Sequence, residues 1–237
     1  MDWLIRLPIA HRGLHQGHQI PENSMAAFEA AIAANHPIEL DIQLLADGQI
    51  AVFHDKDLRR LTGQSGSIFE QTLGTLPSFR LFDSDQTIPS LADVLSLING
   101  RVPLLVELKN EGQVGPLESA LHESLKGYRG EVAIQAFNPF SLRWFKRNAP
   151  SIIRGQLASN FKGEKLALHN KFLLSNLLMN WASEPHFIAY DLRALPGWAT
   201  TFNRRVFNTP LIAWTVRTEA EKNLALAVAD NYIFDAF

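Results

Sequence analysis

Side chains capable of acid–base, metal-binding or phosphate-binding chemistry follow several short apolar runs of this sequence. The apolar residues predict buried strands, and the polar residues stand where each strand is expected to end. These groups are His11-Arg12, Glu39-Leu40-Asp41, His54-Asp55 and Glu107-Leu108-Lys109. Their shared position predicts that they act together rather than as separate surface charges.

The spacing within two of these groups predicts a cluster of carboxylates. Side chains two residues apart on a strand point to the same side, so Glu39 lies with Asp41, and Glu107 lies with Lys109. Three converging carboxylates are costly to bury unless a cation lies between them. Lys109 and Arg12 would offset part of this charge, and a divalent metal would offset it more completely. Oxygen-only ligands favour a hard ion, Mg²⁺ or Ca²⁺.

The cations and histidines predict phosphate chemistry. Arg12 offers a fork of donors, Lys109 offers a point charge, and a metal ion polarises a phosphoryl oxygen. His11 and His54 could serve as general base and general acid on opposite sides of that phosphate. A Schiff base at Lys109 is disfavoured, because the neighbouring Glu107 opposes a neutral amine. The residues alone therefore favour metal-assisted cleavage of a phosphate ester.

The elements that must position these residues alternate between strand and helix. The predicted core strands cover residues 7–11, 37–42, 102–109, 131–136, 151–157, 186–191, 210–215 and 231–234. Helical patterns cover 22–35, 90–98, 115–127, 139–149, 163–182, 196–206 and 218–229. Strict alternation of this kind predicts a parallel sheet, and eight strands in this length predict a (β/α)8 TIM barrel. In such a barrel, chemistry belongs at the carboxyl ends of the strands.

Two details refine this prediction. Asp47-Gly48 between two apolar runs predicts a hairpin after the second strand. The regular pattern weakens over residues 56–88, which we expect to be a small insertion within a single domain spanning 1–237. An open doubly wound sheet is the alternative, but no glycine-rich nucleotide-binding motif follows any predicted strand.

Composition limits the remaining possibilities. With 46% hydrophobic and 19% charged residues, the chain can bury a large core. A net charge of −2 without a basic tract gives no support for a nucleic-acid partner. The absence of cysteine excludes disulfides and thiolate chemistry and fits a cytoplasmic protein. No signal peptide or transmembrane segment is expected, and the apolar stretch 169–181 is predicted to be a buried helix.

Together the motifs resemble the glycerophosphodiester phosphodiesterase family in the right order and over nearly the full chain. The segments that carry the resemblance are AHRG (10–13), PENSMAAFEAA (21–31), IELDIQLLADGQIAVFHD (38–55), LLVELK (104–109) and AWTVRT (213–218).

The resemblance implies a TIM barrel that cleaves glycerophosphodiesters, such as glycerophosphocholine or glycerophosphoethanolamine, to glycerol 3-phosphate and an alcohol. It implies one divalent cation, Mg²⁺ or Ca²⁺. The glycerol 2-hydroxyl would attack phosphorus and water would open the cyclic phosphate, with the two histidines exchanging protons. The implied roles are acid and base for His11 and His54, metal ligands for Glu39, Asp41 and Glu107, and phosphate binding for Arg12 and Lys109.

Other residues have weaker assignments. Glu22 is expected to support the residues that touch metal or substrate without touching either itself. Asn23 or Ser24 is expected to cap the helix that follows. Gln135 and Trp214 are candidates for the substrate pocket, although both would also suit a barrel core. His15 and His18 in the first loop are expected to be solvated, and Arg193 adds a cation near the sixth predicted core strand.

Two other functions remain open at this point. One is a lysophospholipase D or phosphoinositide-phospholipase activity on lipid-tailed phosphodiesters, which would need an apolar or membrane-binding segment; residues 172–181 are the candidate. The other is a non-catalytic phosphate-binding barrel, which predicts loss of a metal carboxylate or histidine, yet all are present. The preferred head group and the oligomeric state stay undetermined.

Overall fold

The computed structural model describes residues 1–110 and 112–237 and divides into two compact units. We call Ala10–Val132 the N-terminal unit, and Met1–Ile9 with Ala133–Asp235 the C-terminal unit. The strand across the boundary at Ile9 is assigned to the N-terminal unit, and the strand across the boundary at Val132 to the C-terminal unit.

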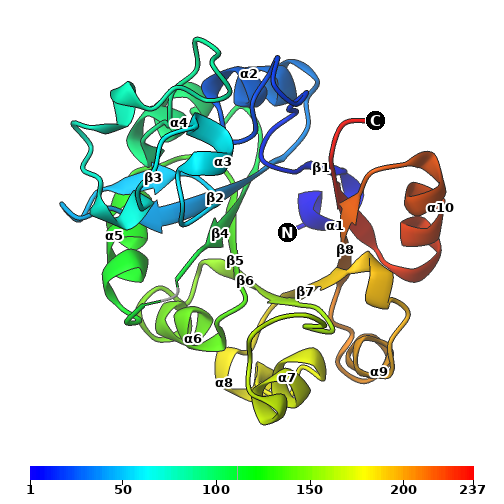
Figure 1. The fold of residues 1–237 in the computed structure, drawn as a ribbon. Helices are drawn as coiled ribbons and strands as arrows, with labels where there is room; N and C mark the ends of the chain where they lie inside the picture. Colours follow the sequence, from blue (N-terminus) through cyan, green and yellow to red (C-terminus); the bar gives the residue numbers. More distant parts are fainter. Residues whose placement is uncertain (111) are drawn as a thin grey trace. The chain divides into compact units, whose positions relative to one another are not determined.

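The N-terminal unit alternates strands with helices and contains one hairpin (Figure 1). β2 pairs in parallel with β1 and β4 and antiparallel with β3, as the hairpin at Asp47-Gly48 predicts. Gly48 has a φ of 79°, which glycine adopts without strain. Its elements are β1 (Ile9–Ala10), α2 (Met25–Ala33), β2 (Ile38–Leu44), β3 (Ile50–Val52), α3 (Arg59–Thr62), η1 (Ile68–Glu70), η2 (Leu76–Ser78), α4 (Leu91–Ile98), β4 (Leu104–Leu108) and α5 (Pro116–Ser124).

The predicted insertion contains α3, η1 and η2 and has its own apolar cluster. Its side chains pack with those of the β2–β3 hairpin, so the insertion is fixed to the strand that carries Glu39 and Asp41. The buried members include Leu45, Phe53, Leu58, Leu61, Ile68, Leu76, Phe79, Leu81 and Ile88.

In the C-terminal unit, parallel strands alternate with helices. β6 pairs with β5 and β7, and β8 pairs with β7 and β9. Figure 1 shows α10 packed beside β8 and β9. The elements are α1 (Trp3–Arg6), β5 (Val132–Ala136), α6 (Pro139–Asn148), β6 (Ile153–Ala158), α7 (Leu168–Ser175), α8 (Asn180–Ser183), β7 (Phe187–Asp191), η3 (Leu192–Ala194), α9 (Trp198–Phe207), β8 (Leu211–Val216), α10 (Glu219–Val228) and β9 (Asn231–Phe234).

The strand order identifies the fold class. The sheet runs β1-β9-β8-β7-β6-β5-β4-β2-β3, and β1 also pairs with β2, so the parallel strands form a closed ring. Without the antiparallel β3, eight strands remain, each matching a predicted core strand. The (β/α)8 TIM barrel is therefore confirmed, and the open doubly wound sheet is excluded.

The predicted buried helix over 169–181 is wrong. The stretch forms two short helices, α7 and α8, and no residue of α7 is buried. Leu177 has a φ of 58°, so the backbone leaves the helix between them. Because the helix breaks there, the apolar side chains cannot form one continuous stripe. Phe172 and Trp181 are 60% and 71% exposed.

Candidate functional site

Three carboxylates from β2 and β4 meet in the N-terminal unit. Asp41 is directly opposite Glu107 in the parallel register, and Glu39 is two residues before Asp41 on the same side of β2. One oxygen of each lies within 4.8 Å of the others, and all three side chains are buried. The structure thus brings together the three predicted metal ligands.

Electrostatics shows why this cluster calls for a cation. Burial, and then the charges of Asp41 and Glu107, raise the pKa of Glu39 well above its usual value. Burial also raises the pKa of Glu107, although Lys109 opposes that effect. For Asp41, Lys109 and Arg12 outweigh burial and lower the pKa. A hard divalent ion fits this oxygen-only donor set and would relieve the repulsion between its members.

Arg12 and Lys109 lie directly beside the carboxylates. The Arg12 Nε is 3.1 Å from Asp41 Oδ2, and Lys109 Nζ is 3.1 Å from Asp41 Oδ1. Lys109 Nζ also donates to Glu107 Oε1 at 2.5 Å. Burial alone would lower the pKa of both cations, but Asp41 and its neighbours raise it instead. Both side chains therefore keep their positive charge at the site.

The chain turns sharply after β1, where His11 and Arg12 stand. Arg12 has a φ of 54° and donates its backbone N–H to Glu39 Oε2 at 3.0 Å. Gly13 has a φ of 80°, and a Cβ there would come within 2.8 Å of the Ala27 backbone. The turn thus needs glycine to pass beside α2, and it holds His11 near the carboxylates.

His54 follows β3, and two neighbours fix its position. Its Nδ1 lies 2.6 Å from Asp55 Oδ1, so Asp55 accepts the Nδ1–H and fixes the orientation of the ring. Gln43 Nε2 donates to the backbone carbonyls of Phe53, His54 and Asp55 at 3.0, 3.0 and 2.7 Å. The charges of both His54 and His11 help to lower the pKa of Asp41, so both histidines lie close to the cluster.

Arg60 of α3 joins two parts of the site that the sequence did not connect. Its Nε donates to Asp55 Oδ2 at 2.5 Å, and its Nη atoms donate to both Glu22 oxygens at 2.8 Å. Glu22 Oε1 also accepts from Arg12 Nη1 at 2.6 Å. Glu22 thus contacts Arg12 and Arg60, and its supporting role at the site stays a prediction. Arg60 was missed because it lies in the insertion, where no regular pattern points to it.

Asn23 belongs to the site and does not cap α2. Its Nδ2 donates to Asp41 Oδ2 at 2.9 Å, and its Oδ1 accepts from the Asp41 backbone N–H at 3.3 Å. Ser24 caps the helix instead, because its hydroxyl accepts from the Ala27 N–H at 3.2 Å. Of the two cap candidates, only Ser24 is therefore correct. Asn23, with a φ of 53°, orients Asp41.

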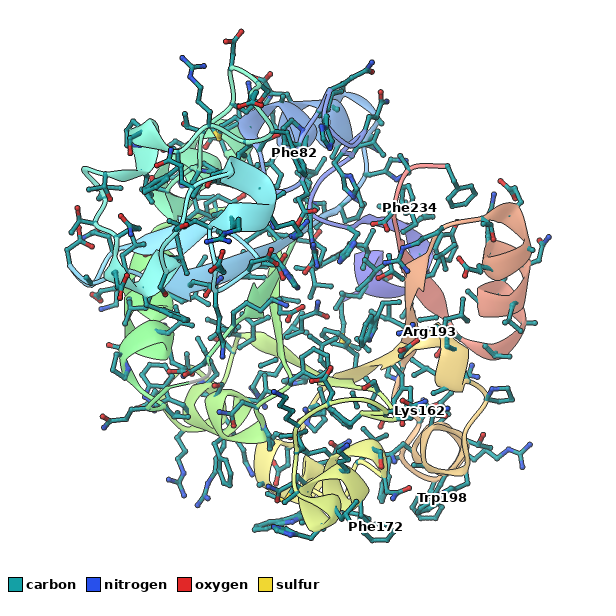
Figure 2. All side chains as sticks on the ribbon, viewed as in Figure 1. Phe82, Lys162, Phe172, Arg193, Trp198 and Phe234 are labelled. Atoms are coloured by element: carbon teal, nitrogen blue, oxygen red, sulfur yellow. The ribbon has the colours of Figure 1, made fainter. Side chains whose placement is uncertain are left out.

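Gln135 and Trp214 belong to the C-terminal unit. Gln135 is buried on β5, and Trp214 on β8 packs edge-on against Phe137 with ring centroids 5.8 Å apart. Both stay candidates for substrate contact. In the same unit, Arg193, which is labelled in Figure 2, donates two side-chain hydrogen bonds of 3.0 and 2.7 Å to Asp191.

The first loop contains two further histidines. His15 is half-buried. His18 is exposed and stacks on Phe82 of the insertion, with ring centroids 4.1 Å apart.

Comparison with known proteins adds sequence and fold evidence. A glycerophosphodiester phosphodiesterase of Caldanaerobacter subterraneus subsp. tengcongensis is 35% identical over 162 residues, covering 64% of this chain and 66% of the relative. One from Bacillus altitudinis is 36% identical, covering 60% and 62%. The matched regions thus span just under two thirds of these relatives.

Solved structures share the fold over nearly the whole chain. An Oleispira antarctica phosphodiesterase in complex with the product sn-glycerol-3-phosphate superposes with a TM-score of 0.79, at 24% identity, covering 97% of this chain and 93% of that one. A putative glycerophosphoryl diester phosphodiesterase from Silicibacter pomeroyi superposes with a TM-score of 0.80 at 17% identity, covering 97% of this chain and 90% of that one.

A family model decides the assignment, because it matches residues 11–234 and so includes every candidate site residue. The chain belongs to the glycerophosphoryl diester phosphodiesterase family.

Proposed function

We propose that this protein hydrolyses glycerophosphodiesters to glycerol 3-phosphate and an alcohol, using one divalent cation, Mg²⁺ or Ca²⁺. The observation that carries the proposal is the buried trio Glu39, Asp41 and Glu107, whose oxygens lie within 4.8 Å of one another, with Arg12 and Lys109 beside them. Family membership and the glycerol 3-phosphate product bound by the Oleispira relative support the substrate class.

The three carboxylates would hold the cation. When bound, the ion would polarise a phosphoryl oxygen and neutralise charge that develops on it. Asn23 keeps Asp41 oriented through its hydrogen bonds to the side chain and backbone of that residue. The side chains therefore supply a fixed set of oxygen donors rather than one assembled on binding.

Arg12 and Lys109 would bind the phosphate of the substrate. Both are largely buried cations whose raised pKa values keep them charged. Their partners on the carboxylate side, Glu22 for Arg12 and Glu107 for Lys109, limit where the charged groups can move. A phosphodiester anion arriving beside Asp41 would thus meet two positioned donors.

His11 and His54 would move the protons. One removes the proton of the glycerol 2-hydroxyl as its oxygen attacks phosphorus, and the other protonates the departing alkoxide. The roles then reverse while water opens the cyclic phosphate and yields glycerol 3-phosphate. Asp55 fixes the His54 ring by accepting its Nδ1–H, so Nε2 is the atom that exchanges the proton.

A substrate panel tests this function. We expect release of glycerol 3-phosphate from glycerophosphocholine and glycerophosphoethanolamine with Mg²⁺ or Ca²⁺, and loss of release in EDTA. Failure to release it from any water-soluble diester, with turnover only of lysophosphatidylcholine or a phosphoinositide, would establish the lipid-directed alternative instead. No turnover of any diester with either ion would leave a phosphate-binding barrel as the function.

A further inference from the structure

An exposed aromatic surface covers α7, α8 and α9 of the C-terminal unit. We define it as Phe172, Trp181, Trp198, Phe202 and Phe207, of which Trp198 is 64% and Phe207 65% exposed. Figure 2 shows Phe172 and Trp198 pointing away from the ribbon. Single exposed apolar residues are ordinary, but large aromatic side chains gathered on consecutive helices mark a surface that binds something.

The aromatic surface contains a groove. Its volume is about 610 Å³, and it runs between α8 and α9. Four of the five surface aromatics line it, together with Leu178. On α9 only Ala199 and Thr200 are buried, so the helix packs on the unit by a narrow side and presents its large side chains outward. These side chains do not serve the core of the unit.

Positive charge accompanies the aromatic residues. Residues 160–207 carry six Lys or Arg and three Asp or Glu, although the whole chain has a net charge of −2. Glu184 is paired with Lys146, Asp191 with Arg193, and Arg204 with Asp230. The other charged residues in this range are Lys162, Lys165, Lys171 and Arg205 against Glu164. Lys171 directly precedes Phe172, and Arg205 is three residues after Phe202 on α9. The surface therefore attracts an anionic partner.

We propose that the aromatic surface docks this protein on an anionic phospholipid bilayer. Tryptophan and phenylalanine beside lysine and arginine are the side chains that bind at the interface between head groups and acyl chains. Among the described residues, no helix is long and apolar enough to cross a membrane. An acyl chain could lie along the aromatic and aliphatic part of the groove, and lipid head groups could meet its polar residues, which are Asn176, Asn180, Glu184, Asn203 and Thr209.

A second copy of the chain fits the aromatic surface less well. Two-fold symmetric pairing would bring the same patch of both copies together, so the positive charges of both copies would share one interface. Such like-charge contacts oppose association, whereas anionic lipid head groups complement the same side chains. Charge thus selects the lipid surface over self-association.

Vesicle co-sedimentation tests the proposal without any substrate, so its result is independent of the proposed phosphodiesterase activity. The full chain is mixed with vesicles of phosphatidylcholine alone, or of phosphatidylcholine with about 30 mol% phosphatidylglycerol. We expect stronger binding to the anionic vesicles, and weaker binding when salt rises from about 0.1 M to about 0.5 M. Trp181→Ser/Trp198→Ser is expected to weaken binding at least about tenfold.

Two further variants test the role of charge and the specificity of the surface. Lys171→Glu/Arg205→Glu changes only surface charge and is expected to remove the preference for phosphatidylglycerol. Phe69→Ser/Leu73→Ser removes exposed apolar side chains from the N-terminal unit and is expected to bind like the wild type. The proposal is overturned if the wild type binds neither vesicle or if both surface variants bind unchanged. It is also overturned if light scattering shows a dimer that Trp181→Ser/Trp198→Ser dissociates.

Discussion

At the scale of single residues, charge and position assign separate tasks to neighbouring groups. Glu39 and Glu107 have raised pKa values because they are buried among like charges, whereas Asp41 has a lowered one because Lys109 and Arg12 outweigh its burial. His11 and His54 stand outside this trio, and we propose that they transfer the protons.

Replacing either histidine tests that division. We expect His11→Ala and His54→Ala each to lower kcat for glycerophosphocholine by about 100-fold or more, because each removes a proton-transfer group. Steady-state kinetics measures the change, and a melting curve checks folding. His169→Ala, an exposed histidine on α7, is the matched control and should keep full activity. Wild-type kcat in either site variant would refute its catalytic role.

We expect Asp55 to support catalysis through His54 rather than by touching substrate. Asp55→Asn keeps the size of the side chain but removes the charged acceptor from the Nδ1–H of His54. We expect a loss of about 10- to 100-fold in kcat with little change in KM, the usual effect of removing such a supporting partner. A shifted acidic limb in the pH profile of kcat would accompany it. An unchanged profile together with unchanged kcat would rule the role out.

At the scale of elements, the insertion contributes more than local packing. Its helix α3 carries Arg60, which holds Asp55 and Glu22 and thereby links the loop of His54 to the loop of Arg12. The strands place the carboxylates, and the insertion fixes the loops around them.

Arg60→Met removes these hydrogen bonds while keeping the aliphatic stem. We expect activity to fall by about tenfold or more, because Asp55 and Glu22 lose a shared partner. The control is Arg59→Met at the adjacent position, where the side chain contacts only Ser65 among the hydrogen bonds of the described residues. Equal activities of the two variants in the glycerol 3-phosphate assay would contradict this role for the insertion.

The same contacts predict how stability depends on pH. Burial opposes ionisation of Glu22 and Asp55. Arg60 donates hydrogen bonds to both carboxylates and His54 donates one to Asp55, and these bonds lower the pKa of each carboxyl below its usual range. A carboxyl with a lowered folded-state pKa stabilises the fold above its unfolded-state pKa of about 4, and this contribution is lost as the pH falls further. Urea unfolding from pH 6 down to about 3 should show this loss. In the double variant Glu22→Gln/Asp55→Asn, the loss of unfolding free energy over this pH range should be smaller. An equal loss in the variant and the wild type would disprove the linkage.

At the scale of the whole molecule, the sequence predicted the fold well because alternating apolar runs are a strong signal. All eight core strands were found, and the strand ends pointed to the site carboxylates, histidines and cations. Arg60 was not predicted, because tertiary folding rather than spacing in the sequence brings its partners close to it. The exposure of α7 and of Trp181 was not predicted, because a continuous apolar stretch does not reveal a helix break such as the one at Leu177.

Metal binding should stabilise the whole molecule. An ion that binds only the folded state at 100 times its Kd adds about 2.7 kcal/mol, which raises Tm by roughly 5–10 °C for a chain of this size. Differential scanning calorimetry of the metal-stripped protein with and without Mg²⁺ or Ca²⁺ measures the shift. Glu39→Gln should reduce it strongly. An equal shift in that variant would place the ion elsewhere.

The most direct test of the account is metal add-back during turnover. The protein is stripped with EDTA and given glycerophosphocholine, and glycerol 3-phosphate is measured as Mg²⁺ or Ca²⁺ is titrated in. We predict no turnover in EDTA, full recovery at one bound ion per chain, and no recovery in Glu107→Gln. Full turnover in EDTA, or recovery in Glu107→Gln equal to the wild type, would contradict a metal-dependent phosphodiesterase built on these carboxylates.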